Sequence, residues 1–325
     1  MKLCKTMLAT VLLASFGIAS AGIAGGSSNR AHVRDGESDI MPFGSGDPGL
    51  SLSNDGNAFS FYVNLENGPV TKINRKFGGT PINGHNNWYG NADGTRNPQH
   101  LRAADVFLPL SLFVREPLGQ VWYEKRHNNT EVYSVRQMAE LSSSGVAAKI
   151  PKFGGLVIAK VPGMPREGNV FFGEWAPRKN GTAPDNSTDL NMGSSQRTVW
   201  YVGENPARNL SNMTISKATY NVVGINNHTP GRNDFYTGQV TADFGSKAVM
   251  GGSISRGDKD TLTFKDVSIN LRNGTFTSTG TTNKEGITGQ FYGTNAAALA
   301  GYATRGNGVG DDVAFGGKQS STTPK

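Results

Sequence analysis

The chain has 325 residues, with 32 Lys and Arg against 25 Asp and Glu, and a formal net charge of +7. This excess is mild and the basic residues are scattered, so the composition does not favour a nucleic-acid-binding protein. The excess could attract anionic ligands, although general solubility explains it equally well. The single cysteine, Cys4, lies near the start, so a processed chain would have no disulfide, thiol nucleophile or thiolate metal site.

Residues 1–21 are predicted to be a signal peptide. Lys2 and Lys5 precede an apolar run at 7–18, and the tripeptide Ala-Ser-Ala at 19–21 fits a cleavage signal. The run is shorter than the roughly 20 residues that span a bilayer. Because the cysteine does not lie at the cleavage point, we expect a secreted protein without a lipid anchor.

Residues 22–165 are predicted to form a β-rich N-terminal domain with long loops. A region without periodicity, rich in Gly and Asn, occupies 78–105, and loops of this length are usually functional or disordered. A polar hairpin tip is expected at 125–130. The other expected elements are strands at 58–65, 70–77, 106–114, 120–124 and 156–161 and a short helix at 135–142.

Residues 166–318 are predicted to form an antiparallel β-barrel, after a linker at 162–168 that contains two prolines and two glycines. About eight strands are separated by turns, with alternation such as Leu262 and Phe264 against Thr261 and Thr263. Side chains can fill a barrel of this size. A short helix is expected at 296–302, a closing strand at 312–315 and a tail at 319–325. The expected strands are 169–176, 197–203, 218–226, 234–244, 247–255, 261–270, 273–280 and 286–293.

The end of the chain also carries a family resemblance. The segment FYGTNAAALAGYATR at 291–305, followed by DDVAFGGK at 311–318, resembles the closing segment of the transferrin-binding protein B barrel. FFGEWA at 171–176 and VWYVG at 199–203 fall where early barrel strands of that group fall. The resemblance implies one lobe, in which an N-terminal handle domain precedes an eight-stranded barrel.

With a single lobe and no lipid-anchor cysteine, the chain looks most similar to the hemophilins, secreted heme-binding proteins of Gram-negative bacteria. The resemblance implies that loops of the handle grip heme through an axial histidine. It also implies export through an outer-membrane translocon of the Slam type and delivery of heme to a TonB-dependent outer-membrane receptor.

Histidines in irregular segments are the candidate axial ligands. A heme site needs an axial nitrogen, flat apolar walls and cations near the propionates. The loop around His85 and the hairpin tip at His127 could supply these as two jaws, although a single loop histidine taken alone is more commonly a solvent-facing residue. The candidates, in order, are His127, His85, His32 and His100. The expected heme contacts are Trp88, Tyr89, Lys125 and Arg126. His228, in a barrel loop, is expected to be structural or incidental.

Enzymatic function is not indicated. The sequence has no G-x-S-x-G, H-E-x-x-H or P-loop pattern, and Arg256-Gly257 with the following aspartate has the composition of a hairpin turn. Apart from heme iron, no metal site is expected. Two functions remain open: a secreted heme carrier, and a heme-free colonisation factor that binds a host protein through the same handle loops.

Overall fold

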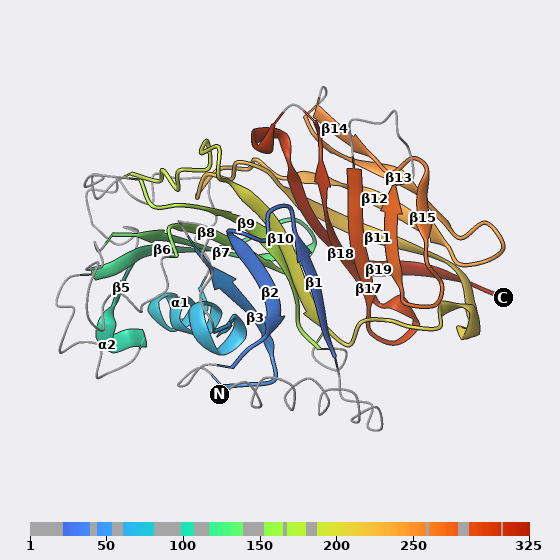
Figure 1. Cartoon of the computed structure of the whole chain (residues 1–325), viewed down its shortest axis with the longest axis horizontal. Coiled ribbons are helices and arrows are strands. Elements are labelled where there is room, and N and C mark those ends of the chain that lie inside the picture. Colours follow the sequence, from blue (N-terminus) through green and yellow to red (C-terminus); the bar gives the residue numbers. More distant parts are fainter. Residues whose placement is uncertain are drawn as a thin grey trace, which may run out of the picture.

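The computed structural model describes residues 22–39, 44–53, 61–80, 99–106, 117–138, 153–164, 168–179, 187–257, 260–278, 286–306 and 308–325. Strands dominate these residues, and they form a seven-stranded sheet, a small three-stranded sheet and a barrel (Figure 1). The predicted fold class, mostly β with a C-terminal eight-stranded barrel, is confirmed. The predicted signal peptide and the candidates His85, Trp88 and Tyr89 lie outside the described residues.

The N-terminal half is built on a seven-stranded sheet in which every neighbouring pair is antiparallel. Its order is β1 (Ile23–Ser27), β10 (Thr198–Glu204), β9 (Val170–Ala176), β8 (Gly155–Lys160), β7 (Glu131–Gln137), β6 (Pro117–Lys125) and β5 (Gln99–Arg102). One face of this sheet is covered by a second layer, and Val33, Leu50 and Ile73 of that layer share a core with Trp175 and Trp200 of the sheet. The layer consists of β2 (Val33–Glu37), β3 (Pro48–Leu52), β4 (Val63–Asn64), a π-helical turn (Glu66–Val70) and α1 (Thr71–Phe77). The short helix α2 (Ala103–Val106) follows β5.

The C-terminal half is a closed antiparallel barrel. Its strands are β11 (Ile215–Ile225), β12 (Tyr236–Asp243), β13 (Val249–Arg256), β14 (Asp260–Thr263), β15 (Val267–Ile269), β16 (Thr275–Ser278), β17 (Gly286–Tyr292), β18 (Ala298–Thr304) and β19 (Val313–Pro324). Because β14 and β15 both pair with β13, they form one interrupted strand, which gives eight. The pairing of β12 with β13 closes the barrel, and closure leaves no unpaired edge.

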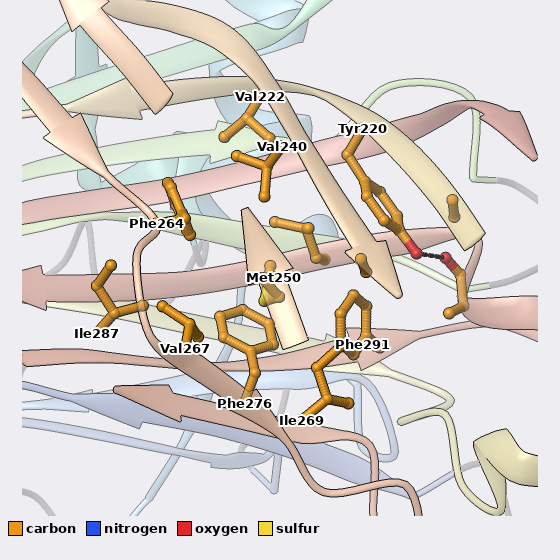
Figure 2. Packing of buried hydrophobic residues seen from close by; sticks show 14 of the residues in the cluster. Tyr220, Val222, Val240, Met250, Phe264, Val267, Ile269, Phe276, Ile287 and Phe291 are labelled. Atoms are coloured by element: carbon orange, nitrogen blue, oxygen red, sulfur yellow. Dashed lines mark hydrogen bonds between the residues drawn. The ribbon is translucent and has the colours of Figure 1, made fainter. Parts of the chain in front are cut away.

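Side chains fill the barrel. Phe276, Phe291 and Met250 lie among the buried residues of its interior, as Figure 2 shows. The hydroxyl of Tyr220 is buried with them and donates to the backbone carbonyl of Ala296 at 2.7 Å, which satisfies the polar group (Figure 2). The barrel is therefore a packed core, as its strand number predicts.

The second face of the seven-stranded sheet packs against the outside of the barrel. Phe172 and Tyr201 of the sheet share one buried core with Val223, Tyr292 and Ala314 of the barrel. Small residues allow a close approach. Ala298 and Ala300 of β18 belong to the same core, and a Cβ added to Gly316 would lie 2.4 Å from Cδ1 of Phe172.

Two strands that were predicted to open the barrel belong to the seven-stranded sheet instead. β9 pairs with β8, and β10 pairs with β9 and β1. Both strands are buried on their two faces, between the second layer and the barrel. They therefore lack the alternation of apolar and polar residues that marks a strand with one exposed face, and the sequence does not show to which sheet they belong. The linker at 162–168 therefore joins two strands of one sheet, and sheet membership changes between β10 and β11.

Some other predicted elements were also wrong. The expected helix at 296–302 is the strand β18 after a 3-10 turn, and the expected tail at 319–325 is mostly the outer half of β19, paired with β11. Residues 71–77 form the helix α1 rather than a strand, and 135–137 belong to the strand β7 rather than to a helix. Within the expected long loop, 99–102 form β5 and 103–106 form α2.

Candidate functional site

The described candidates are divided between the two ends of the seven-stranded sheet. The hairpin tip between β6 and β7 carries His127, beside Lys125, which pairs with Glu131. His32 stacks on Trp175 with ring centroids 5.7 Å apart. Trp175 pairs with Leu156 of β8, whereas Glu131 pairs with Lys160, four residues further along that strand or about 13 Å away. His32 and His127 are therefore not brought together.

His32 and His100 lie on opposite faces of the sheet. His32 is on the face covered by α1, where its Nδ1 is 3.2 Å from the carbonyl of Ser53. His100 in β5 pairs with Gln120, which shares its face with Trp122 on the barrel side. Of the three described candidates, His127 is the one that lies at the predicted hairpin tip.

The ring of His127 is exposed and oriented by the barrel. Its Nε2 is 2.9 Å from Oδ1 of Asn233, and its edge faces Phe235 with centroids 6.4 Å apart. With the amide oxygen as acceptor, Nε2 carries the proton and Nδ1 keeps its lone pair. Histidines that bind metals commonly donate their second ring nitrogen in this way. In this tautomer the free lone pair of His127 is on Nδ1.

The two basic neighbours of His127 have different surroundings. Lys125 is exposed and lines a groove with Asn128 and Asn129. Arg126 is nearly buried, with 7% of its side chain exposed, and pairs with Glu124 at 3.1 Å. Its guanidinium also lies over the ring of Phe235, 5.8 Å from the centroid. Arg126 was expected to pair with a heme propionate, but in the structure it pairs with the carboxylate of Glu124.

A loop of the barrel, residues 226–235, supports the hairpin tip. Two carboxylates of the seven-stranded sheet, both almost fully buried, accept its backbone N–H groups. Glu174 accepts from Asn227 at 3.0 Å and from His228 at 2.6 Å, and Glu124 accepts from Gly231. Such charge-assisted bonds are shorter and stronger than neutral ones. The loop that presents Asn233 to His127 is therefore fixed to the sheet.

His228 holds the centre of this loop. Its Nδ1 is 2.6 Å from Asp234, and its Nε2 is 3.7 Å from Glu124. Burial alone would lower the pKa of His228, but the hydrogen bond and charge of Asp234, with Glu124 and Glu174, raise the pKa above its ordinary value. Glu174 is further paired with the fully buried Arg197 at 2.5 Å. The expectation that His228 is structural agrees with this position.

Sequence reasoning missed Asn233, Glu124 and Glu174. Asn233 lies 106 residues from His127, and nothing in the local sequence links the two. Buried glutamates left a weak signal, since both interrupt otherwise apolar strands, VWYE and FFGEWA. A charge in a strand that is buried on both faces calls for a partner.

No group of three or more His, Cys, Asp or Glu side chains among the described residues is placed to hold a metal ion. In the same part of the chain, no helix has the length and apolar character needed to cross a bilayer.

Comparison with known proteins bears on the barrel. Residues 211–319 match the family model described as the HphA C-terminal domain, and this match begins just before β11. Two crystal structures of HpuA from Kingella denitrificans, one in complex with human haemoglobin and one of the apo haemoglobin receptor, are 10% identical to the chain. The match to the complex covers 95% of this chain and 90% of the HpuA chain, with a TM-score of 0.41. The match to the apo receptor covers 94% of this chain and 89% of the HpuA chain, with a TM-score of 0.43.

Transferrin Binding Protein B from Haemophilus parasuis is similar over a shorter stretch and is 15% identical. The match covers 63% of this chain and 39% of the other chain, with a TM-score of 0.33. The family match is specific to the barrel, and it agrees with the resemblance seen in the closing segment. Residues 211–319 are thus similar to the HphA C-terminal domain, and this match supports a TbpB-like barrel of the hemophilin type.

Proposed function

We propose that the protein is a secreted heme carrier, which binds heme at the loops of its N-terminal half with His127 as an axial ligand. The observation that carries the proposal is the exposed imidazole of His127, whose Nε2 is held by Asn233 while Nδ1 is left to coordinate iron. The match of residues 211–319 to the HphA C-terminal domain model supports a hemophilin-type function. Histidine is a common axial ligand of heme iron.

The proposal extends to the path of the protein and its cargo. We place the protein outside the cell, after a Slam-type translocon has moved it across the outer membrane, and we expect a TonB-dependent receptor to accept the heme. The predicted signal peptide and the family of the barrel support this part. It includes no catalytic step, and the HpuA and TbpB structures with a similar barrel are receptor or binding proteins by their names.

The test is a hemin titration of the parent and His127→Ala, followed in the visible spectrum. We expect the variant to lose at least about tenfold in affinity and to change its spin state, because an axial nitrogen is removed. Added imidazole should restore the parent spectrum by entering the vacated position. Lys247→Ala, which changes an exposed barrel residue, is the control and should bind as the parent does.

His85 remains the second candidate and is tested in parallel. His85→Ala and His32→Ala should keep the parent spectrum if His127 is the axial ligand on its own. If His85→Ala and His127→Ala each lose the parent spectrum, both histidines are ligands, as in the two-jaw arrangement. Parent behaviour of both His127→Ala and His85→Ala would refute the proposed ligands.

A heme-free function is the second candidate. Lys125, Asn128 and Asn129 at the hairpin tip are exposed and polar, which suits a contact with a host protein. This candidate takes the place of the first if the parent protein shows no saturable hemin binding.

A further inference from the structure

The ring of His228 lies between two carboxylates that hold the barrel loop at 226–235. Its Nδ1 is 2.6 Å from Oδ1 of Asp234, and its Nε2 is 3.7 Å from Oε2 of Glu124. The carboxylate of Asp234 also accepts the backbone N–H of Thr229 at 2.8 Å. A neutral imidazole has a proton on one nitrogen and a lone pair on the other, so in the neutral ring a lone pair would face a carboxylate. The geometry therefore favours an imidazolium, which is protonated at both nitrogens.

The charges around His228 balance only when its ring is protonated. Among the described residues, three carboxylates face the ring, from its own loop, from β6 and from β9: Asp234, Glu124 and Glu174. Arg126 pairs with Glu124 at 3.1 Å. Arg197 pairs with Glu174 at 2.5 Å. Three carboxylates and two guanidinium groups leave one negative charge, which the imidazolium cancels.

A pocket of about 530 Å³ opens beside this ring. His228 and Thr229 line it from the barrel loop, and Met192 lines it from the segment that precedes β10. Asp189, which also lines the pocket, is paired with Lys179 at 2.9 Å. The pocket therefore gives the buried proton of His228 a route for exchange with water.

The loop connects the charge of His228 to the hairpin tip. Asp234 is next in sequence to Asn233, whose Oδ1 is 2.9 Å from Nε2 of His127. The ring of Phe235 faces both histidines, with its centroid 4.8 Å from that of His228 and 6.4 Å from that of His127. The two residues that contact His127 thus flank the aspartate that the imidazolium binds.

We propose that His228 is a proton-dependent positioning residue for the hairpin tip. As an imidazolium it holds the loop between the two carboxylates, and the loop then keeps Asn233 against His127. Burial opposes the charge of the ring, but the hydrogen bond and charge of Asp234, with the other two carboxylates, raise the pKa of His228 above its ordinary value. The clamp is therefore in place below the ordinary value of about 6.5 and is lost as the pH rises through the raised one. The inference rests on the proposed function only for the role of His127 as a ligand.

The test is a pH titration of the heme-free protein, in which NMR measures the ring nitrogen chemical shifts of the histidines. These shifts distinguish an imidazolium from either neutral tautomer. The titration starts at about pH 7 and continues until His228 loses its proton. We expect His127 to lose its preference for the Nε2–H tautomer at the same midpoint. In His228→Gln that preference should be absent throughout, whereas Arg232→Gln, which removes one charge from an exposed residue of the same loop, should titrate as the parent does.

Hemin titrations at the same pH values extend the test to binding. We expect the affinity of the parent to fall about fivefold as His228 loses its proton, which corresponds to the loss of one net hydrogen bond. A ring of His228 that is neutral at about pH 7 overturns the proposal, and so does a tautomer of His127 that does not follow its titration, whatever the result with hemin. Coupled titration of the two rings in a protein that binds no hemin supports the proposal and overturns the heme function.

Discussion

Asp312 is a buried carboxyl at the start of β19, with 5% of its surface exposed. Burial raises the pKa of Asp312 to about 6, and the charge of Asp311 adds to this, against the opposing effects of Arg197 and the backbone N–H of Arg305. A carboxyl whose pKa is raised by folding contributes stability below its unfolded pKa of about 3.9 and loses that contribution as the pH rises through 6.

Replacing Asp312 with Asn should therefore stabilise the protein at alkaline pH. The amide resembles the protonated carboxyl at every pH, so Asp312→Asn should melt above the parent at pH 8. The difference should shrink as the pH falls to 5. Thermal unfolding followed by circular dichroism across this range measures it. Asp311→Asn makes the same change of charge at an exposed neighbour and should show a much smaller pH-dependent difference, because Asp311 makes only a minor contribution to the raised pKa of Asp312. A variant that melts below the parent at pH 8 would refute the account.

At the scale of the element, β18 shows how local propensity can mislead. The run of alanines at 296–300 has a composition typical of a helix. In the structure, Ala298 and Ala300 are small because β18 lies against the seven-stranded sheet, and Leu299 points into the barrel. That reason is a contact with a distant sheet, which the local sequence does not reveal. The alternating barrel strands β11 to β17 were predictable because each has a buried and a more exposed face.

The outer half of β19 is a testable element. Removing 319–325 deletes its pairing with β11 from Ile215 to Tyr220 and the bond from the N–H of Gln319 to the carbonyl of Ala297. At about 1 kcal/mol for each net backbone hydrogen bond, we expect a loss of about 2–4 kcal/mol in the free energy of unfolding. Urea denaturation measures this loss.

The control for this deletion keeps the backbone. Ser321→Ala and Thr322→Ala change exposed side chains in the same strand, so both should unfold within about 0.5 kcal/mol of the parent. A truncated protein as stable as the parent would mean that these residues are the tail that their polar sequence predicted.

At the scale of the whole molecule, the seven-stranded sheet and the barrel share a core. A fragment of 166–318, the predicted C-terminal unit, would carry β9 and β10 without their neighbours β8 and β1 and would lack the end of β19. A fragment of 205–325 keeps every barrel strand but would expose Val223, Ile225 and Ala314 on the outside. The same contact accounts for the buried Glu124 and Glu174, which link the barrel loop to the sheet. Barrel and handle therefore cooperate in positioning His127.

The contact between Gly316 of the barrel and Phe172 of the seven-stranded sheet allows a direct test of the packing between the two halves. A Cβ on Gly316 would lie 2.4 Å from Phe172, so Gly316→Val should force the barrel from the sheet and lower the free energy of unfolding by about 1–3 kcal/mol. Gly251→Val is the control, because nothing lies within 4 Å of a Cβ at that strand position. In a Phe172→Ala background the valine should cost less, since the space is vacant. Chemical denaturation of the four proteins measures this coupling. If the cost of the valine is the same in both backgrounds, this contact does not join the two halves.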